Sequence, residues 1–206
     1  MRTRAKICGI TREDDALAAA KHGADAIGFV FHEQSPRCID IDTALSIAHK
    51  LPPFVAIVGL FVNAGPEHIK GILSRLHLDC LQFHGSESPE ECGRYGMTYI
   101  KSVAMREDVD LASVAAQYED AAGLLLDTYV PGVDGGSGKT FDWTRIPRDI
   151  DRPLILAGGL NPENVGAAIR QVNPYAVDVS SGVESSKGIK DAARIAAFLN
   201  EVNKNP

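Results

Sequence analysis

The 206-residue sequence predicts an α/β protein in which residues 1–206 fold as a single (β/α)8 TIM barrel domain. Short apolar runs alternate eight times with segments of helical spacing, which is typical of parallel strands joined by crossover helices. Nearly continuous apolar runs such as 54–62 suit strands that are covered on both faces. No linker or shift in composition divides the chain. Eight such units also fit an open doubly wound sheet, but we favour the closed barrel, for which this length is near the lower limit.

The expected strands are the apolar runs rich in β-branched residues. They lie at 5–8, 25–31, 54–62, 80–83, 99–103, 123–127, 153–158 and 176–181. Seven helices are expected between and after them, at 14–22, 43–50, 66–76, 89–95, 111–118, 162–171 and 189–202. Only the sixth connection, at 142–147, is short and weak, because Pro147 limits any helix there.

Residues at the expected helix starts support these assignments. Thr11 suits the N-cap of the first helix, because its hydroxyl can accept a hydrogen bond from a free backbone N–H. Pro66, Pro89 and Pro162 suit first-turn positions, where the N–H that proline lacks would have no helical partner.

Composition narrows the class of protein. The chain is 45% hydrophobic and carries a formal net charge of -6, which argues against a general nucleic-acid binder. Its four cysteines show no C-x-x-C pair and no metal-ligand spacing, so they are expected to be reduced thiols of a cytosolic protein. The N-terminus lacks a signal-peptide core, and no apolar run is long enough to span a bilayer. We therefore expect a cytoplasmic protein with no nucleic-acid or membrane partner.

A glycine-rich stretch after the sixth strand ends in GSGKT, as a nucleotide-binding P-loop does. The spacing fails, because the position five residues before Gly138 is Val133 and not glycine. We instead expect a lid loop that folds over a bound substrate, with Gly135, Gly136, Ser137 and Gly138 permitting the backbone movement.

Barrel enzymes carry their chemistry at the carboxyl ends of the strands, and two residues there are the strongest candidates. Cys8 ends the first strand, where it is either a structural cysteine or a reactive thiol. Asp127 follows the apolar run of the sixth strand, where a carboxylate without a partner is costly, so it either pairs structurally or takes part in catalysis. A thiol and a carboxyl at one barrel mouth can divide acid and base work.

Four further side chains lie at strand ends and each has a structural alternative. Arg37 suits a carboxylate or phosphate ligand but also a solvated surface. Asp178 can orient a ligand hydroxyl or pair with Lys6 across the barrel interior. His84 can bind a ligand or a loop carbonyl. Lys101 can be a Schiff-base lysine, but an ion pair is the safer interpretation. The remaining histidines show no metal-ligand pattern, so we expect no metal.

The loops after the seventh and eighth strands favour a phosphate site. Gly158, Gly159, Ser180, Ser181 and Gly182 lie where barrels often bind phosphate through backbone N–H groups and the N-terminus of a short helix. The alternative is that these glycines only make tight turns.

Several motifs resemble those of one known family, phosphoribosylanthranilate isomerase of tryptophan biosynthesis. The resemblance covers all eight units, from residue 4 to about residue 198. The motifs that carry it are KICGIT (6–11), SPR (35–37), LQFHG (81–85), LLLD (124–127), GGSGKTFDW (135–143), LAGGLNPENV (156–165) and DVSSGVE (178–184).

The resemblance implies a (β/α)8 barrel and an Amadori rearrangement of an aminoaldose to an aminoketose, with no cofactor or metal. It implies that Asp127 is the general acid and Cys8 the general base, and that the two glycine loops hold the phosphate. Arg37 would hold the anthranilate carboxylate, while Asp178 and His84 would contact the substrate. We expect the pKa of the Cys8 thiol to be lowered by Lys6, and the pKa of a carboxyl in a dry barrel mouth to be raised.

Two other function classes remain open from the residues alone. One is a phosphate-dependent lyase or transferase in which Lys101 captures a carbonyl substrate. The other is a barrel that binds a phosphorylated metabolite without converting it.

Overall fold

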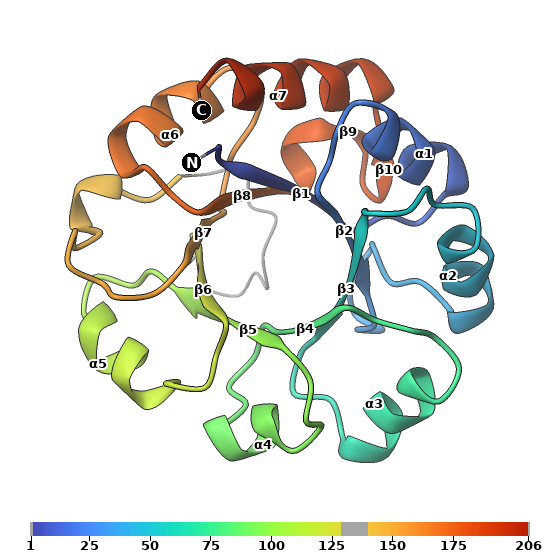
Figure 1. Ribbon diagram of the computed structural model, residues 1–206, viewed down its shortest axis with the longest axis horizontal. Coiled ribbons are helices and arrows are strands. Elements are labelled where there is room, and N and C mark those ends of the chain that lie inside the picture. The colour runs from blue at the N-terminus through green and yellow to red at the C-terminus, as the bar shows by residue number, and fades with distance from the viewer. Residues whose placement is uncertain (1, 129–139, 206) are drawn as a thin grey trace.

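The chain closes eight parallel strands into one barrel, in the order in which they occur along the sequence (Figure 1). The computed structural model describes residues 2–128 and 140–205. The barrel strands are β1 (Arg4–Cys8), β2 (Ala26–Val30), β3 (Ala56–Phe61), β4 (Cys80–Phe83), β5 (Tyr99–Ala104), β6 (Gly123–Asp127), β7 (Leu154–Leu156) and β8 (Ala176–Val179). Every expected strand is confirmed, and β8 pairs with β1 to close the sheet.

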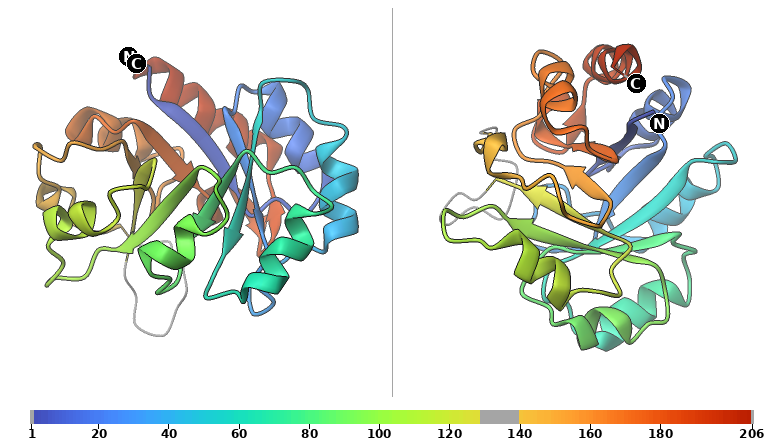
Figure 2. Two further views of the ribbon diagram at one scale, coloured as in Figure 1. Left: turned by 60° about the horizontal axis from the view of Figure 1, so that its bottom comes forward. Right: turned by 60° about the vertical axis from the view of Figure 1, so that its left-hand side comes forward.

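Helices form the outer ring around the barrel (Figure 1). They are α1 (Glu13–Lys21), α2 (Ile41–Ala48), α3 (Pro66–Leu73), α4 (Pro89–Gly93), α5 (Leu111–Gln117), α6 (Val165–Val172) and α7 (Ala192–Lys204). In the described part of the weak sixth connection there is only a 3-10 turn, η1 (Trp143–Arg145), as the proline after it suggests. Side views show α7, in red, lying beside α1, in blue, so the last helix completes the ring next to the first (Figure 2).

Two expectations about helix starts are wrong. Thr11 does not cap α1: Arg12 takes that position, and the Thr11 hydroxyl donates instead to the carbonyl of Gly188 at 2.6 Å. Pro162 is not in the first turn of α6, which begins at Val165. The side chain of Asn161 accepts from the N–H groups of residues 163 and 164, and this turn delays the helix.

A small appendage follows β8 that periodicity does not reveal. It consists of a 3-10 turn, η2 (Ser181–Val183), and a two-stranded hairpin, β9 (Glu184–Ser186) with β10 (Ile189–Lys190). The hairpin occupies the expected start of the last helix, which begins at Ala192, where the Asp191 side chain caps it. The hairpin places Glu184 and Lys190 beside the barrel mouth.

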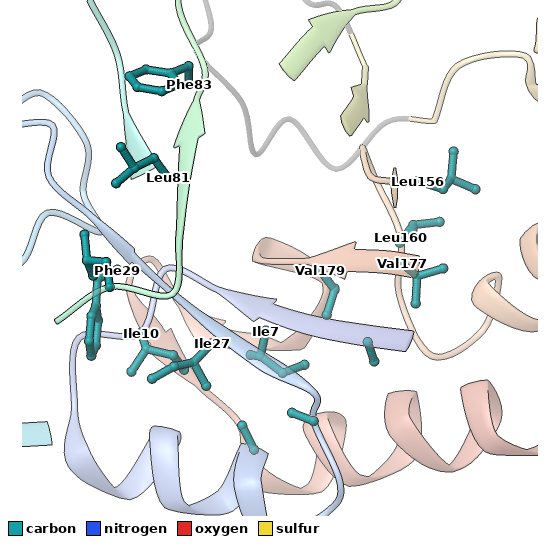
Figure 3. Packing of buried hydrophobic residues seen from close by; sticks show 14 of the residues in the cluster. Ile7, Ile10, Ile27, Phe29, Leu81, Phe83, Leu156, Leu160, Val177 and Val179 are labelled. Atoms are coloured by element: carbon teal, nitrogen blue, oxygen red, sulfur yellow. The ribbon is translucent and has the colours of Figure 1, made fainter. Parts of the chain in front are cut away.

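Side chains along each strand alternate between the two faces of the barrel wall. Outward residues such as Ile7, Phe29 and Leu81 belong to the large apolar core between strands and helices (Figure 3). Inward residues of the same strands include Cys8 on β1 and Gln82 on β4, which line a pocket at the mouth. This alternation decides which strand-end residues are able to meet inside the barrel.

In the described part of the chain, no helix is long and apolar enough to cross a membrane.

Candidate active site

One pocket at the carboxyl ends of the strands brings together most of the predicted site residues. Its lining includes Cys8, Arg37, His84, Asp127, Gly158, Gly159, Asp178, Ser180 and Ser181. Gly182 is not among the lining residues. The predicted lid residues Gly135, Gly136, Ser137 and Gly138 lie outside the described residues, so their role stays a prediction.

Cys8 ends β1 with its thiol almost fully buried at the pocket floor. The neighbouring strand makes room for it, because a Cβ atom on Gly28 would lie only 2.8 Å from the Cys8 Sγ. Burial raises the pKa of the Cys8 thiol above its ordinary value, although Lys6 and Lys190 act to lower it. The expectation of a lowered pKa is therefore wrong, since burial outweighs the nearby cations.

Lys6 and Asp178 form an ion pair inside the barrel, with 2.7 Å between Nζ and Oδ1. They are register partners on β1 and β8, and both side chains are nearly inaccessible to solvent. Burial alone would lower the pKa of Lys6, but Asp178 and Cys8 outweigh it and hold that pKa above its ordinary value. Lys6 is therefore a permanent cation beneath the Cys8 thiol.

Asp127 ends β6, and both of its carboxylate oxygens have partners. Oδ1 accepts the backbone N–H of Thr128 at 2.8 Å, and Oδ2 lies 3.2 Å from His84 Nε2. His84 in turn contacts Gln82, with 3.1 Å between Gln82 Nε2 and His84 Nδ1. A Cβ atom on Gly158 would overlap the Thr128 hydroxyl and lie 2.9 Å from Asp127 Oδ1, so only glycine fits beside this carboxylate.

Arg37 reaches the pocket from the loop after β2 and is held by Glu184 of the hairpin. Its Nε and one terminal nitrogen donate to the two Glu184 oxygens at 2.7 and 2.9 Å, a bidentate pair. Lys190 Nζ, which has no exposed surface, lies 2.9 Å from Glu184 Oε1 and also donates to the carbonyl of Ser180. Burial raises the pKa of Glu184, but Arg37 and Lys190 outweigh it and leave that pKa below its ordinary value.

Glu184→Gln is expected to lower the free energy of unfolding by about 3 kcal/mol, because two buried cations lose their counter-charge. The lowered pKa means that Glu184 stabilises the fold above about pH 4.3, where it is ionised in both states, and stops doing so as pH falls through its folded pKa. Urea denaturation of both proteins at pH 7 and again at acidic pH measures the difference, which should shrink in acid. Glu67→Gln, at an exposed pair with Lys70, should leave the midpoint unchanged; equal effects of the two changes would refute this account of Glu184.

The loops after β7 and β8 meet at the side of the pocket. Gly158 and Gly159 both adopt positive φ angles, 79° and 65°, which favour glycine. A Cβ atom on Gly182 would overlap the carbonyl oxygen of Leu160, so Gly182 is needed for the close packing of the two loops. Ser180 and Ser181 stand at the start of η2 and face the pocket.

Lys101 lies outside the pocket. It is a buried residue of β5, and its Nζ lies 3.1 Å from Glu87 Oε2 and donates to the carbonyl of Gly85 at 2.5 Å. Its ammonium also lies 5.7 Å from the ring centre of Tyr118. The interpretation of Lys101 as part of an ion pair is confirmed.

A second hollow of about 780 Å³ lies away from these residues. It is lined by η1, by the beginning of β7 and by the end of α6, and its polar side chains include Arg148, Arg152 and Arg170. The described lining holds no histidine, cysteine or carboxylate, so it offers no group for proton transfer at neutral pH.

Sequence reasoning missed three polar residues of the site, Gln82, Glu184 and Lys190. Gln82 had a usable signal, because it is polar at an inward position of an otherwise apolar strand. Glu184 ends the DVSSGVE motif, but neither its pairing nor Lys190 had a signal, since their short hairpin has no periodicity and they meet only after it folds back. Among the described residues, no three histidine, cysteine or carboxylate side chains gather as a metal site would require.

Comparisons with known proteins agree on one family. The model of N-(5′-phosphoribosyl)anthranilate (PRA) isomerase matches residues 5–201. The chain is 58% identical over 203 residues to the N-(5′-phosphoribosyl)anthranilate isomerase of Nitrosococcus oceani, covering 98% of both proteins. Its fold is similar to the crystal structure of phosphoribosyl anthranilate isomerase from Thermotoga maritima, with a TM-score of 0.91, 46% identity and coverage of 98% and 99% of the two chains.

A further solved structure is informative because of its ligand. It is a phosphoribosyl anthranilate isomerase in complex with reduced 1-(o-carboxyphenylamino)-1-deoxyribulose 5-phosphate. The present chain is similar to it with a TM-score of 0.87 and 43% identity, covering 98% of this chain and 99% of that one.

Proposed function

This chain belongs to the N-(5′-phosphoribosyl)anthranilate isomerase family, and we propose that Asp127 and Cys8 perform the acid and base steps of the family's reaction. The observation that carries the proposal is that a carboxyl and a thiol, from strands far apart in the chain, line the same pocket at the barrel mouth.

The protein is an aldose–ketose isomerase of tryptophan biosynthesis. Its reaction is the Amadori rearrangement of N-(5-phosphoribosyl)anthranilate, an aminoaldose, to 1-(2-carboxyphenylamino)-1-deoxyribulose 5-phosphate, an aminoketose. The rearrangement needs one group to give a proton and one to take a proton.

Asp127 gives its proton to the ribose ring oxygen. The bond between that oxygen and C1′ then breaks, and the lone pair of the anilino nitrogen forms an iminium ion. Cys8, as a thiolate, removes the proton from C2′, which leaves an enolamine. The enolamine becomes the ketone when its hydroxyl loses a proton and C1′ gains one, so substrate and product carry the same number of protons.

The two loops that meet beside the pocket are proposed to bind the substrate phosphate through Gly158, Gly159, Ser180 and Ser181. Gly182 supports them by packing. Arg37 is proposed to bind the anthranilate carboxylate. Its pair with Glu184 uses two of the three guanidinium nitrogens and holds the side chain at the pocket rim.

Asp178 is proposed to help position the substrate and, through Lys6, to supply a cation below the Cys8 thiol. His84 is proposed to act beside Asp127, with which it shares a short contact. The closing of the loop around Gly136, which lies outside the described residues, over the bound substrate stays a prediction.

Because the pKa of the Cys8 thiol is raised, the thiolate should be a minor form of the free enzyme at neutral pH. The ultraviolet absorbance of thiolate, taken as wild type minus Cys8→Ala, should therefore develop only above about pH 8.5, the pKa of an ordinary cysteine. A Cys8 signal already complete at pH 7 would contradict the effect of burial that we assign.

We further propose that residues 1–206 act as one domain in the cytoplasm, without an obligate protein, nucleic-acid or membrane partner. All four cysteines are unpaired, which suits a reducing compartment. The net charge of -6 does not favour nucleic acid.

Rescue of a tryptophan auxotroph that lacks only this isomerase tests the function in a cell. We expect the wild-type chain to restore growth without tryptophan. Lack of growth, with the protein present and folded in the extract, would count against the function.

A further inference from the structure

Gln82 occupies an unusual place for an amide. It is completely buried on β4, among the residues that line the pocket. Its Oε1 is buried and has no hydrogen-bond partner among the described residues. A buried polar atom without a partner costs free energy, so packing alone does not explain glutamine at this position.

The contact between Gln82 and His84 decides which nitrogen of a neutral imidazole carries the proton. The amide nitrogen of Gln82 only donates, and it lies 3.1 Å from His84 Nδ1. Nδ1 must therefore accept, which leaves the proton of the neutral ring on Nε2. Nε2 is the atom that lies 3.2 Å from Asp127 Oδ2.

These contacts lead from Gln82 through His84 to the proposed acid. Gln82 donates to His84, whose Nε2 lies 3.2 Å from one carboxylate oxygen of Asp127, while Thr128 N–H donates to the other. Asp127 becomes a carboxylate at the moment it gives its proton to the ring oxygen. Donors already placed beside that charge stabilise ring opening with little reorganisation.

We propose that Gln82 is a positioning residue, which holds His84 in the tautomer that donates to Asp127. The inference rests on the proposed role of Asp127. Gln82 acts through His84.

Gln82→Met and Gln82→Glu are the variants that test this role. Methionine has a similar length and removes the donor, so kcat should fall about tenfold while KM changes less than about threefold. Glutamate has the same shape but accepts, so it should draw the proton to Nδ1 and lower kcat further. Wild-type kcat in Gln82→Met would overturn the proposal.

A double-mutant cycle shows whether the effect passes through His84. In a His84→Asn background, adding Gln82→Met should change kcat less than about twofold, because the contact through His84 is already lost. The full tenfold loss in that background would contradict action through His84.

The tautomer itself is measurable without activity. Nitrogen-15 spectra of the wild-type protein should show His84 Nδ1 unprotonated and Nε2 protonated, and Gln82→Glu should reverse the state of Nδ1. A protonated Nδ1 in the neutral wild-type ring would overturn the proposal even if every variant failed to fold. An active Asp127→Asn would instead refute the proposed function, so the two failures are distinguishable.

Discussion

Asp127→Asn is expected to reduce kcat by about 10³-fold, within the usual range for loss of a general acid. Asparagine keeps the shape of the side chain, and its oxygen accepts the Thr128 N–H as Asp127 does. It has no acidic proton to give to the ribose ring oxygen, so the ring stays closed. Because the phosphate and carboxylate contacts are elsewhere in the pocket, KM should change less than about threefold. Steady-state assays of product formation measure both constants.

The matched control for this change is Asp120→Asn. Asp120 is exposed in the turn that precedes β6, whereas Asp127 ends the same strand in the pocket. The control should keep wild-type kcat. Turnover near the wild-type rate in Asp127→Asn would rule out Asp127 as the acid.

Cys8→Ala should cause a loss of similar size, about 10³-fold in kcat, because no thiolate remains to remove the C2′ proton. Alanine is smaller than cysteine in a site closed by Gly28, so the fold should be retained at a modest cost in stability. Cys38→Ala, at an exposed thiol, should keep the wild-type kcat. Equal losses at Cys38 and Cys8 would show that the effect is not specific to the pocket.

Isotopic substitution separates the two roles. Cys8→Ser places a poorer base at the same position, so proton removal from C2′ should become rate-limiting. Deuterium at C2′ should then slow Cys8→Ser more than the wild type, whereas Asp127→Asn, limited at ring opening, should be less sensitive. If deuterium slowed Asp127→Asn more than Cys8→Ser, Asp127 would be the base and Cys8 the acid.

The barrel was predictable because its signals are local. Each strand is an apolar run, and the rule that side chains alternate makes the end of β1 and the end of β6 project into one mouth. Cys8 and Asp127 could be found in this way from the sequence.

The electrostatics of the site were not predictable in the same way. The pKa of Cys8 depends on how completely β2 and the pocket floor exclude water. The effect of this burial outweighs that of Lys6, whose charge can be read from the sequence. The pairing of Arg37 with Glu184 depends on a hairpin of short strands whose sequence has no clear period. Such features arise from tertiary contacts between residues distant in sequence.

A crystal structure of this protein with reduced 1-(o-carboxyphenylamino)-1-deoxyribulose 5-phosphate would show which groups contact the sugar and the phosphate. We expect Cys8 Sγ about 3.5 Å from C2′ of the sugar, the Asp127 carboxyl beside the hydroxyl that derives from the ring oxygen, and the phosphate between the loops at 158–159 and 180–181. A sugar that contacts neither Cys8 nor Asp127, or a phosphate bound elsewhere, would contradict these assignments.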